Sequence, residues 1–262
     1  PEFGNGGEVA LAEHGRFKPD QVASSSPPAI ANGVIVVGSS IIDFALAEAP
    51  RGVVAAFDAA SGSPLWQFDP LAGIAHTGGA NVWAPIAIDA ERDLVFLPTS
   101  APSPDYYGVL RPGNNQNANS VVALRLSTGK QIWSFQLSHH DLWDFDTPAQ
   151  PTLFDWPGEH GPIPALAQVT KQGFVFVLDR RSGEPLLPIE ERPVATSSIP
   201  GEVTSPTQPF PVKPPPLMPT SLAADEAWGL TFWDRQQCRD KIAALNNQGL
   251  FTPPSEQPTL MF

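Results

Sequence analysis

Short apolar runs, separated by polar breaks that contain glycine or proline, extend along most of the chain. Residues 33–38 and 94–98 are continuous apolar runs, and turn residues at 89–93 precede the second run. Runs of this length, bounded by turn signals, are typical of β-strands that are buried on both faces. The pattern therefore predicts central strands of a sheet at these two positions.

Three strand–turn–strand patterns share one arrangement. Each starts with an apolar strand and passes through a turn in which Asp, Ser or Thr precedes a glycine. Glycine supplies the positive φ that such a turn requires, and the polar side chains bond its backbone. In the first two copies a tryptophan, Trp66 or Trp133, follows the glycine, and Leu187 takes this position in the third. The apolar strands are expected at residues 53–57, 121–124 and 174–178.

Hairpins of this kind, repeated at intervals of roughly 50–70 residues, are typical of β-propeller blades. The tryptophans are then expected to pack between neighbouring blades. A β-sandwich with coincidental hairpins is the alternative, but the three copies agree in offset as well as in composition. We therefore predict an all-β fold in which residues 1–262 form a single partial β-propeller domain.

Residues 188–249 interrupt the strand pattern. Ten of the 32 residues in the stretch 188–219 are proline, which predicts an extended excursion over the surface rather than a regular element. Two short helices are expected after it. Ser221 is the predicted N-cap of a helix over 222–228.

The second helix is expected to start at Thr231, which forms a capping box with Asp234, and to end at Gly249. Cys238 belongs to an apolar stripe at helical spacing within it. A small buried apolar residue explains this cysteine better than a reactive thiol does.

Composition and charge narrow the function classes. The chain contains 31 prolines and 21 glycines, which favours turns and short strands over a helical bundle. Its net charge of −12 repels phosphate backbones, so nucleic acid is not expected as a partner. The single cysteine excludes an internal disulfide bond and a cysteine-rich zinc site. No apolar run of ~18 residues and no leader-like pattern occurs, so no membrane span is expected within these residues.

The densest polar cluster is the sequence HHDLWDFD at residues 139–146. Its carboxylates and imidazoles, next to a tryptophan, could provide a general base or metal ligands. Neighbouring side chains of an extended chain point to opposite sides, so His139 and His140 are not expected to bind one ion together. A solvated turn with hydrogen-bonding aspartates explains the cluster equally well when it is taken alone.

Seven ordered motifs extend the picture beyond this cluster. They are ANVWAP at 80–85, SPDYYG at 103–108, HHDLWD at 139–144 followed by PAQPTL at 148–153, KQG at 171–173, VLDRR at 177–181, SPTQPF at 205–210 and FTPPS at 251–255. Together they resemble the pyrroloquinoline quinone (PQQ) dependent dehydrogenases related to membrane-bound glucose dehydrogenase and quinate/shikimate dehydrogenase. The resemblance implies an eight-bladed family propeller, of which this chain holds about four blades with tryptophan-docking repeats.

The resemblance also implies roles for individual residues. Asp144 matches the catalytic base, which removes the alcohol proton. Lys171 matches the lysine that contacts the quinone oxygens of the cofactor. Trp83 matches the aromatic residue that stacks on the flat ring system. A base of this kind must be poorly solvated, with a nearby cation that keeps its pKa from rising too far.

Asp43 and Ser103 match the positions of ligands for Ca²⁺ or Mg²⁺, hard ions that prefer oxygen donors. The chain departs from the family pattern beside Asp43, because Phe44 stands where asparagine is usual as a further ligand. Phenylalanine cannot coordinate a metal, so a lower affinity or a substitute oxygen is expected.

The function implied is oxidation of an alcohol, sugar or polyol, with electrons passed to a quinone acceptor. The implied location is the periplasm, for a parent protein that a segment outside these residues could anchor to the inner membrane. The alternative is a truncated propeller without redox activity, acting as a binding module or with hydrolytic activity at an exposed cleft. Self-association through open blade edges is a further expectation, since unpaired strands invite pairing.

Overall fold

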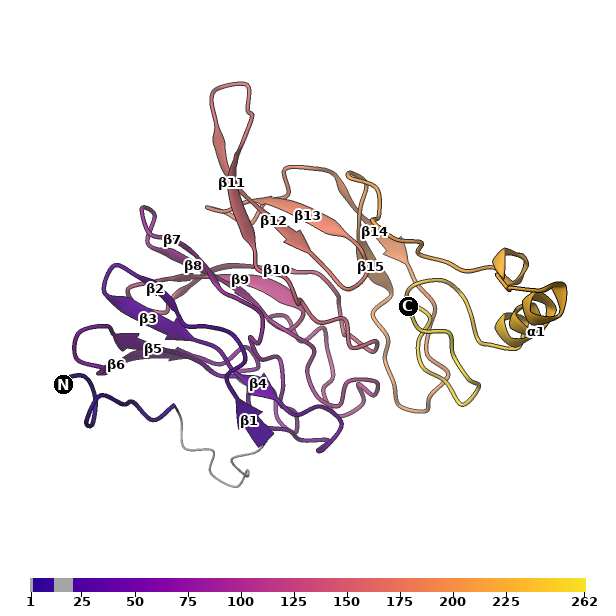
Figure 1. The fold of residues 1–262 in the computed structure, drawn as a ribbon, viewed down its shortest axis with the longest axis horizontal. Coiled ribbons are helices and arrows are strands. Elements are labelled where there is room, and N and C mark those ends of the chain that lie inside the picture. Colours follow the sequence, from indigo (N-terminus) through magenta and orange to yellow (C-terminus); the bar gives the residue numbers. More distant parts are fainter. Residues whose placement is uncertain (1, 12–20) are drawn as a thin grey trace.

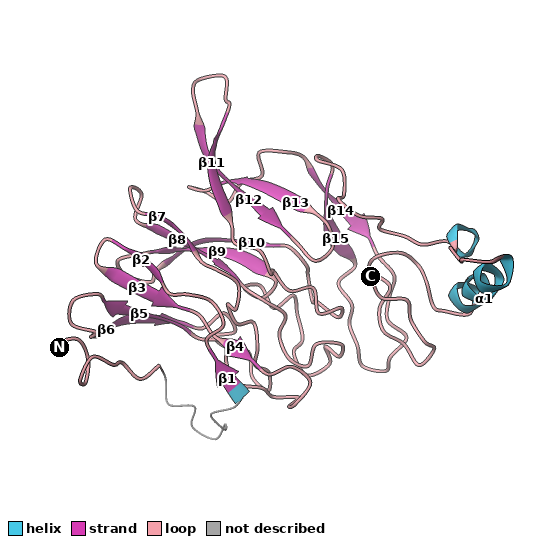
Figure 2. Ribbon diagram, viewed as in Figure 1, coloured by secondary structure: helices cyan, strands magenta, loops and turns pink. Residues whose placement is uncertain are grey.

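The computed structural model describes residues 2–11 and 21–262, and their regular structure is almost entirely β-strand (Figure 2). The strands are β1 (Val22–Ala23), β2 (Ala29–Ala31), β3 (Val34–Val37), β4 (Ser40–Ile41), β5 (Val54–Asp58), β6 (Pro64–Phe68), β7 (Ala87–Asp89), β8 (Leu94–Pro98), β9 (Ser120–Arg125), β10 (Gln131–Gln136), β11 (Thr152–Trp156), β12 (Ile163–Val169), β13 (Val175–Asp179), β14 (Ile189–Pro193) and β15 (Thr207–Pro211). The helices are a 3₁₀ turn, η2 (Ala224–Glu226), and α1 (Phe232–Ala243). Within the described residues, no helix is long and apolar enough to span a membrane.

The sheets are consecutive antiparallel meanders. Strands β2-β3-β5-β6 and β7-β8-β9-β10 form two four-stranded sheets, and β11-β12-β13 form a three-stranded one. Figure 1 shows these sheets side by side in chain order, followed by the β14–β15 ribbon. A series of up-and-down sheets of this kind defines propeller blades. The all-β, partial-propeller prediction is confirmed.

The core lies between neighbouring blades. In β8, Val95 and Leu97 belong to the cluster shared with the first blade, whereas Leu94 and Phe96 belong to the cluster shared with the third. Successive side chains of a strand point to opposite faces, so a blade packed on both faces needs apolar residues at every position. This arrangement confirms β8 as a strand buried on both faces, and the strand order confirms β3 as a central strand of the first sheet.

Each repeat tryptophan docks on the turn of the next blade. Trp66 Nε1 donates to the carbonyl oxygen of Leu126 at 2.8 Å. Its ring covers Gly129, where an added Cβ would lie 2.7 Å from the indole and φ is +70°. Trp133 covers Gly183 in the same way. The predicted packing of tryptophans between blades is confirmed. The repeat glycine also leaves the space in which the tryptophan ring of the neighbouring blade packs.

The third copy of the repeat is incomplete. After β13 only an isolated bridge joins Leu178 to Pro185, and Leu187 lies outside any strand. Proline lacks the N–H that a strand pairing needs, and Pro185 and Pro188 flank this position. The expected second strand of this hairpin is therefore absent from the described residues.

The prediction that the proline-rich stretch has no regular element is wrong, because β14 and β15 pair within it. Pro193, Pro209 and Pro211 occupy alternate rungs of that ladder, opposite Thr207, Glu191 and Ile189. In an antiparallel pair only every second residue exchanges N–H bonds with its partner. The prolines occupy the other positions, where the missing N–H would point outward.

The two predicted helices had different outcomes. Thr231 is the N-cap of α1, with its hydroxyl accepting from the backbone N–H of Asp234 at 3.3 Å. The helix ends at Ala243, however, well before Gly249. The first helix is only the short turn η2, preceded by Ala223 rather than by the predicted cap Ser221.

The prediction of a buried Cys238 is also wrong, since this cysteine is exposed and α1 has no buried residue. The helix lies at the edge of the molecule, away from the sheets (Figure 1). Its apolar stripe has no facing surface among the described residues, and helical spacing alone cannot supply one.

Candidate functional site

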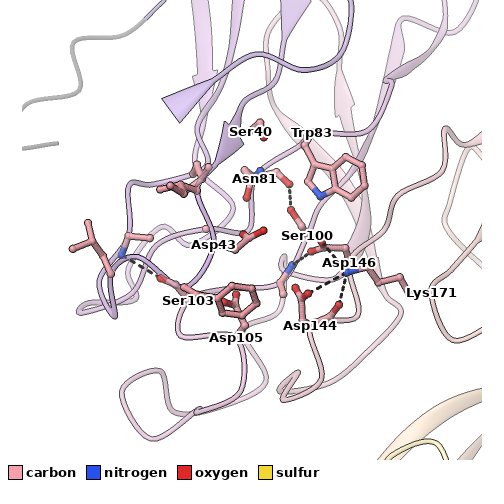
Figure 3. A pocket seen from close by; sticks show the side chains of 17 residues that line it. Ser40, Asp43, Asn81, Trp83, Ser100, Ser103, Asp105, Asp144, Asp146 and Lys171 are labelled. Atoms are coloured by element: carbon pink, nitrogen blue, oxygen red, sulfur yellow. Dashed lines mark hydrogen bonds and ion pairs between the residues drawn. The ribbon is translucent and has the colours of Figure 1, made fainter. Parts of the chain in front are cut away.

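All five residues singled out from the sequence line one cavity of about 360 Å³ (Figure 3). They are Asp43, Trp83, Ser103, Asp144 and Lys171. Asp43 follows β4, Trp83 precedes β7, Ser103 follows β8, Asp144 follows β10, and Lys171 lies in the β12–β13 turn. Each comes from a loop held by a different strand. Convergence of loops on a rigid sheet scaffold is a common way to build a site.

Lys171 and Asp144 form the charged centre of the cavity. Lys171 Nζ donates to the backbone carbonyl oxygen of Asp144 at 2.8 Å and to its carboxylate at 3.2 Å. A second carboxylate, Asp146, accepts from the same ammonium at 3.2 Å. Burial, reinforced by the charge of Asp146, raises the pKa of Asp144 to about 7, while Lys171 opposes the rise. The group is thus poorly solvated and beside a cation, the environment expected of a catalytic base.

The loop around Asp144 is held by bonds to its backbone and to its neighbours. Asp144 has φ +57°, in the left-handed region that Asp tolerates better than most residues. The next N–H, of Phe145, donates to the Asp141 carboxylate at 3.2 Å, and Phe145 O accepts from Asn119 at 3.0 Å. On the other side, Trp143 Nε1 donates to the carbonyl of Thr252 at 2.7 Å. These bonds keep an unusual backbone conformation that presents the carboxylate to the cavity.

Asp43 and Asp105 form an acidic side of the cavity. Burial, followed by repulsion from Asp146, raises the pKa of Asp43. Burial also raises the pKa of Asp105 to about 6, with repulsion from Asp43 and Asp146 adding to it. A cation placed among these carboxylates would favour their ionised forms and so lower their pKa values.

Sequence reasoning missed Asp105 and Asp146 as lining residues. The available signal was their spacing, since each follows a predicted site residue, Ser103 or Asp144, by two positions. Both lie within or directly beside motifs that carried the family resemblance.

Ser103 lines the cavity with its oxygen already engaged. Its Oγ accepts from the backbone N–H groups of Ala49 at 3.2 Å and Gly78 at 3.0 Å. A hydroxyl has two acceptor lone pairs, so coordination of a metal would displace one of these bonds. Among residues 2–11 and 21–262, no group of three or more His, Cys, Asp or Glu side chains has a metal-holding arrangement. An ion at Asp43 would therefore need further oxygen ligands of other kinds, such as hydroxyl, backbone carbonyl or water oxygens.

Phe44 lies at the rim of the cavity, where it stacks on Tyr106 with ring centroids 5.7 Å apart and planes 13° apart. Its side chain remains 69% exposed. The position that carries asparagine in the resembled family is thus an apolar wall here.

The two histidines of the polar cluster do not line the cavity. His139 pairs with Glu191 at 3.1 Å, and His140 pairs with the buried carboxylate of Glu202 at 2.6 Å. Both partners belong to the proline-rich stretch, so the histidines fasten that stretch to the loop that bears Asp144.

Antiparallel blades with a polar cavity lined by their connecting loops define this chain as part of a β-propeller with a candidate ligand site. The whole chain, residues 1–262, matches the PQQ family described as "Glucose/ethanol/alcohol dehydrogenase, beta-propeller domain". The chain belongs to this family of PQQ-dependent dehydrogenases.

Relatives with named activities cover nearly the whole chain. The glycerol dehydrogenase large subunit of Gluconobacter oxydans is 42% identical over 97% of this chain and 36% of its own length. The quinoprotein glucose dehydrogenase of Escherichia coli is 40% identical over 94% and 32%, respectively. The quinate/shikimate dehydrogenase (quinone) of Acinetobacter baylyi is 37% identical over 100% and 34%. The chain thus spans about a third of the length of these relatives.

Solved structures agree on the fold. A quinohemoprotein alcohol dehydrogenase of Pseudomonas putida superposes with a TM-score of 0.55 at 26% identity, over 64% of this chain and 28% of that one. The quinohemoprotein alcohol dehydrogenase of Comamonas testosteroni gives a TM-score of 0.55 at 25% identity, over 71% and 31%.

Proposed function

We propose that this chain contributes the base, cofactor contacts and metal ligand of a PQQ-dependent dehydrogenase. Its substrate class is an alcohol, sugar or polyol, and its electron acceptor is a quinone. The observation that carries the proposal is the convergence of five predicted residues on one cavity, with Asp144 beside Lys171. The family relatives, named for glycerol, glucose and quinate or shikimate, support the reaction class.

The cavity suits a flat anionic cofactor. Its volume of about 360 Å³ falls within the range of small-molecule pockets, ~300–1,000 Å³. The half-buried Trp83 offers a planar wall, and Lys171 offers a cation for negatively charged oxygen atoms. PQQ, when bound, would supply the quinone that accepts a hydride from the substrate carbon.

The same cavity suits one hard divalent cation, Ca²⁺ or Mg²⁺. Asp43 and Asp105 supply carboxylate oxygens, and a cation near them would offset the burial and the repulsion that raise both pKa values. Ser103 would join them only by releasing a backbone N–H bond. Phe44 contributes no ligand, so we expect weaker metal binding than an asparagine at this position would give.

Asp144 would act on the substrate hydroxyl as a general base. Its carboxylate must be ionised to accept the proton, and its pKa of about 7 leaves a large ionised fraction at neutral pH. Lys171 favours this ionised form and, through its bond to the Asp144 carbonyl, fixes the orientation of the loop.

The test is a binding titration of PQQ with Ca²⁺ or Mg²⁺ to the full-length protein, followed by tryptophan fluorescence. Lys171→Ala and Trp83→Ala should each weaken binding by about fivefold or more, since each removes a contact worth ~1–3 kcal/mol. Trp228→Ala is the matched control, because this tryptophan is 75% exposed and does not line the cavity.

Dye reduction with glycerol, glucose, quinate and shikimate then identifies the substrate. A full-length protein that neither binds PQQ nor reduces dye would reject the proposal and favour the binding-module alternative.

We also propose the periplasm as the compartment and self-association through open blade edges as a property of the isolated chain. Cell fractionation tests the first proposal. Sedimentation of the isolated chain that shows only monomer would contradict the second.

A further inference from the structure

Arg111 is the largest fully buried side chain of the described residues, with 0% exposure. It lies in the loop between β8 and β9 and does not line the cavity. Its Nη1 donates to Asn115 Oδ1 at 3.0 Å, and its Nη2 donates to the carbonyl oxygen of Pro104 at 3.0 Å. The same nitrogen donates to the carbonyl oxygens of Asp105 and Asp141. One guanidinium therefore donates hydrogen bonds to three backbone carbonyl oxygens.

The bonded carbonyls belong to the two loops that carry most of the cavity's polar groups. Pro104 and Asp105 follow Ser103 directly, and Asp141 precedes Asp144 by three residues. Because the acceptors are main-chain atoms, the Arg111 hydrogen bonds fix the two loop backbones relative to each other. Bonds to side chains would fix only the rotamers of those side chains. The planar guanidinium suits this task, since it presents several donors in a rigid fork.

The charge of Arg111 is balanced by carboxylates from three separate segments. Burial lowers the pKa of Arg111, while Asp141, Glu202 and Asp105 raise it. Of these, Asp105 lines the cavity. A buried charge without partners would be strongly destabilising, so the three carboxylates offset the cost of burying the Arg111 guanidinium.

Two of these carboxylates bond the same loops again. The fully buried Asp141 accepts from Ser138 Oγ at 3.1 Å and from the N–H of Phe145, next to Asp144, at 3.2 Å. Glu202 accepts from the N–H of Gly108 at 2.6 Å and pairs with His140 at 2.6 Å. Arg111 is thus the hub of a network that binds both site loops and the proline-rich stretch.

We infer that Arg111 is a positioning residue of the dehydrogenase site, which holds the Ser103–Asp105 and Asp141–Asp144 loop backbones at the separation that the reaction requires. The role rests on the proposed function, since it concerns the placement of the base and of the acidic side of the same cavity. It requires no contact between Arg111 and substrate or cofactor.

The test compares Arg111→Gln and Arg111→Lys with a matched control, Arg180→Gln, in the full-length protein. Arg180 is also largely buried and ion-paired, with Asp89 at 3.0 Å, but lies outside the cavity lining. Arg111→Gln should lower kcat by about 10²-fold with KM within about threefold, because displacement of a catalytic group by ~1 Å has an effect of that size. Arg111→Lys should recover part of the loss, since one ammonium cannot reach all the acceptors. Arg180→Gln should lower the melting temperature without lowering kcat.

Hydrogen exchange gives a second readout that does not depend on PQQ. In Arg111→Gln the amides of Gly108 and Phe145 should exchange faster by about tenfold or more, while those of β3 and β5 remain unchanged. A kcat within about threefold of wild type, or exchange accelerated equally in all blades, would overturn the inference. If Arg111→Gln fails to fold, Arg111→Lys removes the same fork of donors, and the exchange of the Gly108 and Phe145 amides decides. A wild-type protein without PQQ binding would remove the proposed function, whereas the exchange result would still show whether Arg111 clamps the two loops.

Discussion

Lys171 donates from one ammonium to both the backbone carbonyl oxygen of Asp144, at 2.8 Å, and its carboxylate, at 3.2 Å. The first bond stabilises a left-handed backbone conformation at Asp144, and the second favours its ionised form. Loop geometry and proton affinity at the proposed base therefore depend on the same side chain.

Replacement of this lysine should change the titration of its partner. In Lys171→Met the pKa of Asp144 should rise above about 7, because the charge and hydrogen bond that lower it are lost while burial and Asp146 remain. Carboxyl-carbon NMR of Asp144 measures the shift. Lys130→Met, in an exposed hairpin turn, is the control and should leave Asp144 unchanged. An unchanged or lowered pKa in Lys171→Met would show that the ammonium does not control the proton.

The pH dependence of turnover should report the same carboxylate. A general base must be ionised, so kcat/KM should fall as the pH drops below about 7. A bound cation would shift this limb to lower pH, and its removal by chelation should shift it back. Asp144→Asn should lower kcat/KM by at least ~10²-fold, whereas Asp155→Asn, at an exposed site, should have no effect. A profile without an acidic limb would argue against Asp144 as the base.

Stability of the cofactor-free and metal-free protein should decrease from mildly acidic to neutral pH. Burial raises the pKa of Asp144 to about 7 and those of Asp105 and Asp141 to about 6, from an unfolded value of 3.8. Between these values the folded state binds more protons than the unfolded state, so the stabilisation present below pH 3.8 is lost as the pH rises through about 6–7.

Calorimetry from pH 4.5 to 7.5 measures this decrease. Asp144→Asn should flatten the curve and raise the melting temperature at pH 7.5 by a few degrees, because about 1 kcal/mol corresponds to ~2–4 °C in a protein of this size. A wild-type melting temperature that rises over this interval would contradict the expectation.

The docking of a tryptophan on a glycine predicts a sharp steric requirement. Gly129→Ala should destabilise the fold by about 2–4 kcal/mol, since its Cβ would meet the Trp66 ring at 2.7 Å and its φ is +70°. Gly113→Ala is the matched control, with φ +82° and no atom within 4 Å of the added Cβ. It should cost only about 1 kcal/mol. Urea denaturation of the two variants separates the steric effect from the backbone effect. Equal losses of unfolding free energy in the two variants would contradict the packing of Trp66 on Gly129.

The exposure of Cys238 predicts ready modification. A thiol-specific reagent should label one equivalent in the native protein, at a rate close to that in denaturant, because the side chain on α1 is exposed. Cys238→Ser should abolish the labelling and leave the melting temperature within about 1 °C, as surface substitutions usually do. Labelling that requires denaturant would show that another surface covers α1.

Local features of the fold were predictable because their causes lie within a few residues of each other. The continuous apolar run at β8 and the Gly129 turn predict a strand and a hairpin from residues that are close in sequence. Thr231 likewise capped α1 as predicted, since a cap needs only its own first turn. The failure in the proline-rich stretch has a distant cause, whereas the helix expected at 222–228 failed although its signals were local. The ladder that pairs Pro193 with Thr207 depends on a register that spacing of prolines alone did not reveal.

The residues of the site also divide into those that the sequence indicates and those that only the tertiary structure reveals. The family resemblance that the motifs carry was enough to group Asp144, Lys171 and Trp83 in one site. Only the tertiary structure decided that Asp105 and Asp146 join them, that the Ser103 hydroxyl is already bonded, and that a buried Arg111 clamps the loops. The physical reason is that burial, pKa and hydrogen-bond partners depend on atoms brought together from separate blades. Sequence spacing fixes only the contacts that form within one hairpin, loop or helical turn.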